Sequence, residues 1–222
     1  LWDEFDSCGR SDLDAYVWSE DGLLVGRGSK RQSPESSSCH PSERLKVFTA
    51  EEGWHYLQIH RTRGAGETRM DIMARGGTVH QYMASGSIVD PGSSPGAFTV
   101  GAVFAGGYAT ESVESFSSQG PTSGGRSKPD IAGPDGLDSF SYGPQPFYGT
   151  SAATPAVAGA AALVLGRDPS LSPLEAAQFL ESNALPGLSP EADGAGRARL
   201  PAPGAAAGSC SGGLATGPFL WL

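Results

Sequence analysis

A serine lies between a glycine-threonine turn and a run of small residues whose composition predicts a helix. The segment, FYGTSAATPAVAGAAALVLG, spans residues 147–166, and this serine is Ser151. At a helix N-terminus, backbone N–H groups and the helix dipole stabilise negative charge, including an oxyanion that forms beside a nucleophile. A hydroxyl held there is suited to acyl transfer once a base removes its proton. The alternative is that the same hydroxyl only caps the helix.

The residues around Ser151 fit the entry into a helix predicted over residues 152–165. Gly149 allows the chain to turn sharply, and Thr150 leads from the turn into the helix. Pro155 is tolerated because it falls within the first turn, where backbone N–H groups lack intrahelical partners. Small residues cover most of the remaining helix surface, so we expect it to pack closely against its neighbours.

Elements on either side of this helix are predicted to position it. The run FTVGAVFA, residues 98–105, is almost entirely apolar, which is typical of a strand buried on both faces of a parallel sheet. A second helix is predicted in SPLEAAQFLESNA, because Ser172 caps it, Pro173 fills its first position and Glu175 completes a capping box. Residues 187–222 are rich in Gly, Ala and Pro, and we expect them to be an irregular tail.

Residues 1–82 show a different pattern, in which short apolar runs alternate with turns. Residues 17–25 are predicted to form a hairpin around the dipeptide Asp21-Gly22, a sequence that is common in tight hairpin turns. Further apolar runs lie at residues 45–48, 54–60 and 70–73. We therefore expect a small antiparallel β-sandwich over residues 1–82, followed by a separate region over residues 83–186.

Composition and charge limit the classes of function that this protein can have. The 222 residues are 38% hydrophobic and 18% charged, as in a folded globular protein, and the formal net charge is −9. The sequence contains no lysine- and arginine-rich stripe that could displace counterions from phosphates, so we expect no nucleic-acid partner.

The cysteines and histidines do not suggest a metal site. Cys8, Cys39 and Cys210 fit no zinc-ligand spacing, and no HExxH or CxxC cluster is present. Cys8 and Cys39 could form a disulfide if the protein is secreted. We identify no cofactor. An acidic group near the start is better explained as a solvated edge that discourages strand aggregation than as a calcium site; it comprises Asp3, Glu4, Asp6, Asp12 and Asp14.

The two ends of the sequence suggest a fragment. The chain begins without an initiator methionine and shows no signal peptide. Its last four residues, 219–222, are apolar but too few to span a bilayer. They could begin a truncated membrane anchor, although we favour a simple tail.

Four motifs, in order, resemble those of the subtilisin-like serine proteases. GTSAATPAVAG closely resembles the family's sequence around its nucleophile, Gly-Thr-Ser-x-Ala-x-Pro-x-Val-Ala-Gly. Upstream, FTVGAV resembles a strand leading to the catalytic region, FSSQGP resembles a Phe-Ser-Ser-x-Gly-Pro turn, and KPDIAGPDG resembles a Lys-Pro-Asp-Ile-x-Ala-Pro-Gly stretch. The resemblance covers residues 87–184, the C-terminal part of such a catalytic domain. Residues 1–82 resemble, more weakly, a β-sandwich module inserted into it.

The resemblance implies a fold and an activity. The fold would be α/β, with a mainly parallel sheet flanked by helices. The activity would be hydrolysis of protein or peptide substrates through an acyl-enzyme on Ser151. Family members are commonly secreted, so the resemblance implies an extracellular or cell-envelope protein. Calcium is common in the family, but no ligand set in this sequence identifies a site.

Departures from the family pattern limit what this chain can do. Ala156 stands where many relatives carry histidine, and Gly133 replaces an alanine. The family's aspartate motif, its His-Gly-Thr motif and its Ala-Gly-Asn oxyanion element are absent, and no histidine has the context of a general base; the four are His40, His55, His60 and His80. We expect the missing groups upstream, in an absent half of the protease domain, and expect the 222 residues alone to be nearly inert. The alternative is a non-catalytic binding protein that combines a β-sandwich with a vestigial protease half.

Overall fold

The computed structural model describes residues 2, 11–33, 40–47, 52–74 and 79–201. The chain divides into two compact units, Leu1–Val79 and His80–Leu222, which we call unit 1 and unit 2.

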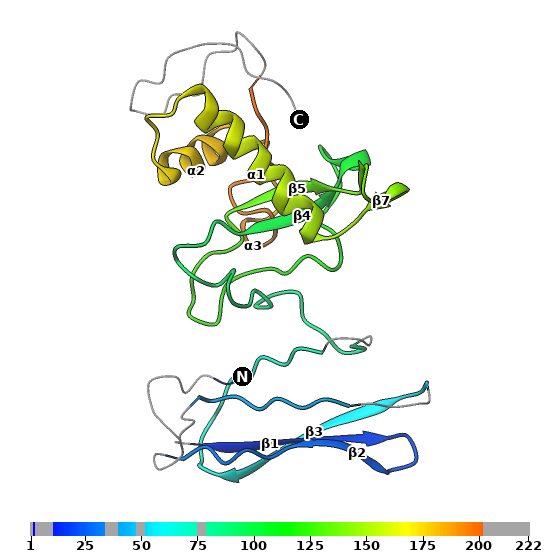
Figure 1. Ribbon diagram of the computed structural model, residues 1–222. Coiled ribbons are helices and arrows are strands. Elements are labelled where there is room, and N and C mark those ends of the chain that lie inside the picture. Colours follow the sequence, from blue (N-terminus) through cyan, green and yellow to red (C-terminus); the bar gives the residue numbers. More distant parts are fainter. Residues whose placement is uncertain (1, 3–10, 34–39, 48–51, 75–78, 202–222) are drawn as a thin grey trace. The chain divides into compact units, whose positions relative to one another are not determined.

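Unit 1 contains one antiparallel sheet. Its strands are β1 (Asp12–Ser19), β2 (Leu24–Gly28) and β3 (His55–Arg63), in the order β2-β1-β3 (Figure 1). The turn between β1 and β2 places Gly22 at a φ of 77°, and the Ser19 N–H donates to the Leu23 carbonyl over 2.8 Å. The hairpin predicted around Asp21-Gly22 is therefore confirmed.

A second sheet, which a β-sandwich requires, is not confirmed for unit 1. The predicted strand near residue 45 forms no ladder, although it packs over β2: a Cβ atom added to Gly26 would lie 2.8 Å from Val47 Cγ2. Met70 makes only an isolated bridge with Trp2. Neither run forms a strand of a ladder, and the side chains of Met70, Ile72 and Met73 are exposed. The described residues of unit 1 therefore form a single three-stranded sheet.

Unit 2 is built on a parallel pair of strands. β4 (Val100–Phe104) and β5 (Ile131–Asp135) pair from Val100↔Ile131 to Phe104↔Asp135, and the helix α1 (Thr150–Arg167) packs against both (Figure 1). Ala102 and Val103 of β4 are fully buried, as the apolar run predicted, and so are Ile131 and Ala132 of β5. A mixed α/β architecture is therefore confirmed for this unit.

The strands and α1 approach closely because small residues separate them. Ala153, Val157, Ala160 and Val164 recur at helical spacing and form the buried face of α1. At Gly133 of β5, an added Cβ atom would lie 2.8 Å from the Ala153 carbonyl oxygen. Gly133 thus leaves the space that the backbone of α1 occupies.

The helix α2 (Pro173–Ser182) completes the core. Its predicted capping box is present: the Glu175 N–H donates to Ser172 Oγ, while the Ser172 N–H donates to Glu175 Oε2 over 2.7 Å. Phe179 and Leu180 are buried in the same cluster as the inner face of α1.

The chain after α2 packs along β5. It forms a short helix, α3 (Pro190–Asp193), and then runs beside the strand, where the Ala198 N–H donates to the Ala132 carbonyl over 2.8 Å. Arg197 is fully buried and donates to the Tyr108 carbonyl over 2.6 Å and to the Glu111 carbonyl. Residues 187–200, expected to be irregular, therefore contribute to the folded core.

Among the described residues, no helix combines the length and the hydrophobicity needed to cross a membrane.

Candidate active site

Ser151 is the second residue of α1, and its side chain is exposed. The residue before the helix, Gly149, has a φ of 119° and a ψ of 162°, and it has no side chain with which to cap the helix. The N–H groups of Ala152 and Ala153 donate to the Gly149 carbonyl over 2.8 and 3.2 Å. The Ser151 N–H lies in the first turn, where helical N–H groups have no intrahelical acceptor and are available to an anion.

A buried carboxylate holds the turn that precedes Ser151. Asp135 ends β5, its side chain is fully buried, and its Oδ2 accepts a hydrogen bond of 2.8 Å from the Gly149 N–H. Asp135 Oδ1 has no hydrogen-bond partner among the described residues. Asp135 is not among the residues predicted from the sequence, although a carboxylate at the end of a buried strand is a signal that could have found it.

Aromatic contacts hold the same turn. A hairpin of β6 (Leu137–Ser139) and β7 (Gly143–Phe147) connects β5 to α1. After it, the Tyr148 ring stacks on Phe104 with centroids 6.1 Å apart. Gly136, at a φ of 66°, leaves room for this pair, because an added Cβ atom would lie 2.8 Å from the Phe104 ring. The approach to Ser151 is therefore fixed by both polar and aromatic contacts.

The ends of β4 and β5 lie in an acidic environment. The pKa of Glu114 is raised, first by burial and then by the negative charges of Asp135 and Glu111. The 3-10 turn Ala105–Gly107 follows β4 on this side, and the Glu114 N–H donates to the Ala102 carbonyl over 2.8 Å.

The histidines of the chain are all solvent-exposed. His40, His55 and His60 belong to unit 1, and His80 is the first residue of unit 2. Ser151, the single catalytic residue assigned from the sequence, lies at the start of α1 in unit 2.

No group of three or more metal-ligating side chains capable of holding a metal ion occurs in the part of the chain that the structure describes. The expected solvated acidic edge is wrong for Asp12 and Asp14, because both are buried and belong to β1, the central strand of its sheet. Asp12 accepts a hydrogen bond of 3.0 Å from the Gln32 N–H, and Asp14 accepts one of 3.0 Å from the Tyr16 hydroxyl. Several predictions fall outside the described residues: the proposed Cys8–Cys39 pair, Cys210, the acids at positions 3, 4 and 6, and the apolar end at 219–222.

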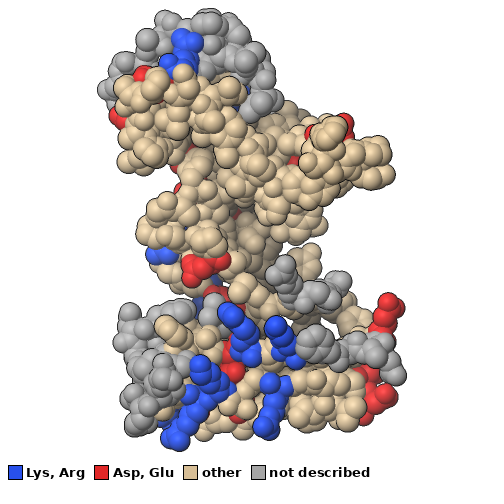
Figure 2. Space-filling view, in the orientation of Figure 1, with Lys and Arg blue, Asp and Glu red and all other residues tan. Residues whose placement is uncertain are grey.

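Figure 2 shows lysine and arginine side chains on the visible face of unit 1. Two arginines of β3 have local partners: Arg61 donates to the Gly66 carbonyl over 2.6 Å, and Arg63 donates to the Gln32 carbonyl. The absence of a nucleic-acid partner stays a prediction.

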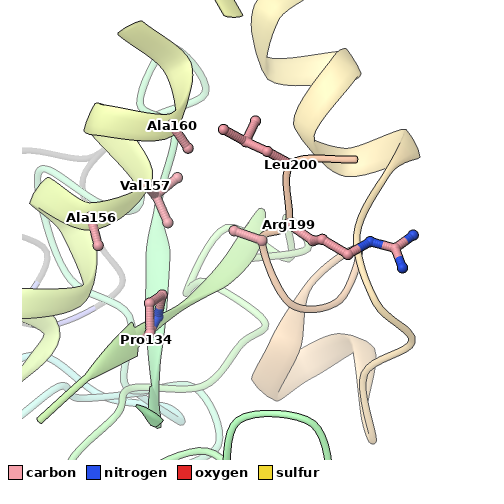
Figure 3. Close-up of a pocket in the computed structure, with 7 residues that line it drawn as sticks. Pro134, Ala156, Val157, Ala160, Arg199 and Leu200 are labelled. Atoms are coloured by element: carbon pink, nitrogen blue, oxygen red, sulfur yellow. The ribbon is translucent and has the colours of Figure 1, made fainter. Parts of the chain in front are cut away.

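A small cavity lies beside α1, and Ser151 is not among the residues that line it. Its volume is about 20 Å³, and its lining is mostly apolar (Figure 3). The Arg199 side chain extends away from α1 in this view, so its charge does not enter the cavity. The lining residues are Pro134, Ala156, Val157, Ala160, Ala198, Arg199 and Leu200. A space of this size holds a water molecule at most, so it is a packing defect and not a substrate site.

Comparison with known proteins identifies the family. The subtilase family model matches residues 19–203, which include both strands of the parallel pair, α1 and α2. Over a 118-residue alignment, the chain is 40% identical to the serine protease AprX of Bacillus subtilis. The alignment covers 44% of this chain and 27% of AprX, so the chain spans about a quarter of the length of that curated relative. On this evidence, the chain belongs to the subtilase family.

Proposed function

We propose that this protein is a serine endopeptidase and that Ser151 is its nucleophile. The observation that carries the proposal is the exposed Ser151 hydroxyl at the N-terminus of α1, directly after the Gly149 turn, in a chain of the subtilase family. The similarity to a protein named as a serine protease supports the same activity. Substrates would be proteins or peptides.

The proposed reaction uses the two groups that Ser151 presents. A general base takes the hydroxyl proton while Oγ attacks the scissile carbonyl, and the Ser151 N–H helps to bind the resulting oxyanion. The proton then passes to the leaving amine as the peptide C–N bond breaks. Water, activated by the same base, releases the acyl group and restores the hydroxyl. We propose that the histidine base, the aspartate that orients it and the oxyanion asparagine lie outside these 222 residues.

Unit 1 is proposed to be a module inserted in the protease domain. The family match begins at Ser19, within the first strand of unit 1, which supports this placement. We also propose that the protein acts outside the cytoplasm, as subtilases commonly do. Calcium binding remains a proposal that rests on the family resemblance alone.

The test uses the protein at its full natural length and a serine-directed fluorophosphonate probe. We expect labelling of the wild type, and we expect Ser151→Ala to lose both labelling and peptide hydrolysis. Ser170→Ala is the matched control, because it removes an exposed hydroxyl whose partner is Asp168 and should leave both unchanged. Hydrolysis that persists in Ser151→Ala would place the nucleophile elsewhere. A wild type that neither labels nor hydrolyses peptides would support the non-catalytic binding protein.

A further inference from the structure

The start of α1 is capped from another element. Helices usually begin with a side chain that accepts a backbone N–H, but Gly149 has none and the first turn contains no acid. The acceptor at this position is instead Asp135, which is 14 residues earlier in the sequence and belongs to β5. A carboxylate beside a helix N-terminus also complements the helix dipole.

The carboxylate of Asp135 is rigidly supported. Its backbone pairs with Phe104 at the end of the parallel ladder, and its side chain is fully buried. Gly136 follows with its positive φ under the stacked rings of Phe104 and Tyr148. Because Asp135 Oδ1 has no partner among the described residues, the bond from Gly149 is the single hydrogen bond that the structure gives this carboxylate.

We infer that Asp135 is a positioning residue, which fixes the Gly149 turn and thereby the direction of the Ser151 hydroxyl. The inference rests on the proposed role of Ser151 as the nucleophile. Only Thr150 separates Gly149 from Ser151, so a rotation of the unanchored turn would move Oγ relative to a base and a bound carbonyl. Displacements of about 1 Å at a reacting atom can reduce rates by about 100-fold.

Two substitutions separate positioning from other effects. Asp135→Ala removes the acceptor, whereas Asp135→Asn keeps an oxygen that can accept the Gly149 N–H without the charge. In the full-length protein we expect Asp135→Ala to lower kcat and the fluorophosphonate labelling rate by about 10- to 100-fold, with KM changed less than about twofold. In Asp135→Asn both rates should stay within about threefold of the wild type, because the asparagine oxygen still accepts the Gly149 N–H.

Asp138→Ala is the matched control. Asp138 is an exposed carboxylate in β6, three residues along the same chain, and its removal should leave both rates unchanged. The inference is overturned if Asp135→Ala reacts as fast as the wild type. It is also overturned if Asp135→Asn, with an unfolding midpoint equal to that of the wild type, fails to recover the rates.

A second measurement does not depend on proteolysis. In the 222-residue chain, hydrogen exchange of the Gly149 amide should be about tenfold faster in Asp135→Ala than in the wild type or in Asp135→Asn, because that amide loses its acceptor. An unchanged exchange rate in Asp135→Ala overturns the inference whatever the enzyme assays show. If Ser151→Ala instead remains active while the exchange rates behave as expected, the assignment of the nucleophile fails and the anchoring of the turn stands.

Discussion

At the scale of single residues, the setting of Ser151 depends on groups that lie near it only after folding. Gly149 adopts a φ of 119°, which L-residues with a Cβ rarely reach, and it leads directly into α1. The Asp135 carboxylate accepts the Gly149 N–H of this turn, and the ring of Tyr148, the preceding residue, stacks on Phe104. The hydroxyl is exposed while the backbone beneath it is held, which is the combination that a nucleophile requires.

A residue-scale prediction concerns the capping box of α2. Hydrogen bonds from the Ser172 N–H and hydroxyl lower the pKa of Glu175, because both stabilise its ionised form. Ser172→Ala removes the hydroxyl bond but keeps the backbone one, so the Glu175 pKa should rise part of the way to its ordinary value. An NMR titration of the Glu175 side-chain carboxyl carbon measures this.

The sign of the associated stability change follows from the lowered pKa. A carboxyl with a lower pKa in the folded state stabilises it above the unfolded-state value, about 4.5, and this contribution is lost as the pH falls through the folded value. The stability difference between wild type and Ser172→Ala should therefore be larger at pH 7 than at pH 3. Ser182→Ala, whose hydroxyl donates to the Gln178 carbonyl, should show no such pH dependence. An equal Glu175 pKa in Ser172→Ala and wild type would contradict the account.

At the scale of elements, the packing of α1 on β5 explains a departure from the family pattern. Gly133 stands where the family pattern has alanine, and an added Cβ atom would lie 2.7 Å from Val157 Cγ2 and 2.8 Å from the Ala153 carbonyl oxygen. The helix thus sits too close to the strand for a methyl group. Glycine at position 133 is therefore explained by the close contact between β5 and α1.

We therefore predict that Gly133→Ala, although it restores the family residue, destabilises the protein by about 1–3 kcal/mol through overpacking. The control is Gly159→Ala on α1, where no atom lies within 4 Å of an added Cβ. That substitution should stabilise the helix by about 0.5–1 kcal/mol, because alanine has the higher helix propensity. Urea denaturation followed by circular dichroism measures both. A neutral or stabilising Gly133→Ala would show that α1 and β5 are less closely packed than described.

Some elements could be predicted from the sequence because their signals are local. The capping box of α2, the small-residue run of α1, the apolar run of β4 and the Asp21-Gly22 turn each depend on neighbouring residues, and the structure confirms each. The expected second sheet of unit 1 is not found among the described residues, because whether an apolar run pairs as a strand depends on partners that are distant in the sequence.

The candidate site shows the same division. The position of Ser151 at a helix N-terminus follows from its local motif, and the structure places it there. The link from Asp135 to Gly149 joins residues 14 positions apart and depends on how β5, the β6–β7 hairpin and α1 meet. No local sequence pattern predicts how these elements pack, so the hydrogen bond from Gly149 to Asp135 could be found only in the folded structure.

At the scale of the whole molecule, the segment that follows α2 packs into the fold of unit 2. Its composition, rich in Gly, Ala and Pro, predicts irregular structure, but Arg197 anchors it through the carbonyls of Tyr108 and Glu111, which are 89 and 86 residues away in the sequence. Asp193 lies 3.6 Å from the Arg197 guanidinium and accepts the Leu188 N–H over 2.6 Å. One buried arginine thus joins the end of the described chain to its middle.

We predict that Arg197→Met destabilises unit 2 by about 3–5 kcal/mol, because it leaves the buried Asp193 carboxylate without its ion-pair partner and the Tyr108 and Glu111 carbonyls without their donor. Arg199→Met is the matched control, since this partly buried arginine donates to the Asn183 carbonyl over 3.1 Å and its loss should cost about 1 kcal/mol. Guanidinium unfolding of the two variants measures the difference. Equal losses would show that the C-terminal segment is not anchored by Arg197.

The central claim is that Ser151 is the nucleophile, and the most direct measurement is to locate a covalent fluorophosphonate adduct on the full-length protein by mass spectrometry. Trypsin should release Ser151 in one peptide, residues 127–167, because Lys128 precedes a proline and is not cleaved. Fragmentation of that peptide should place the adduct on Ser151 and not on the serines at 127, 139 or 141. An adduct on any other serine, in a protein that hydrolyses peptides, would contradict the assignment.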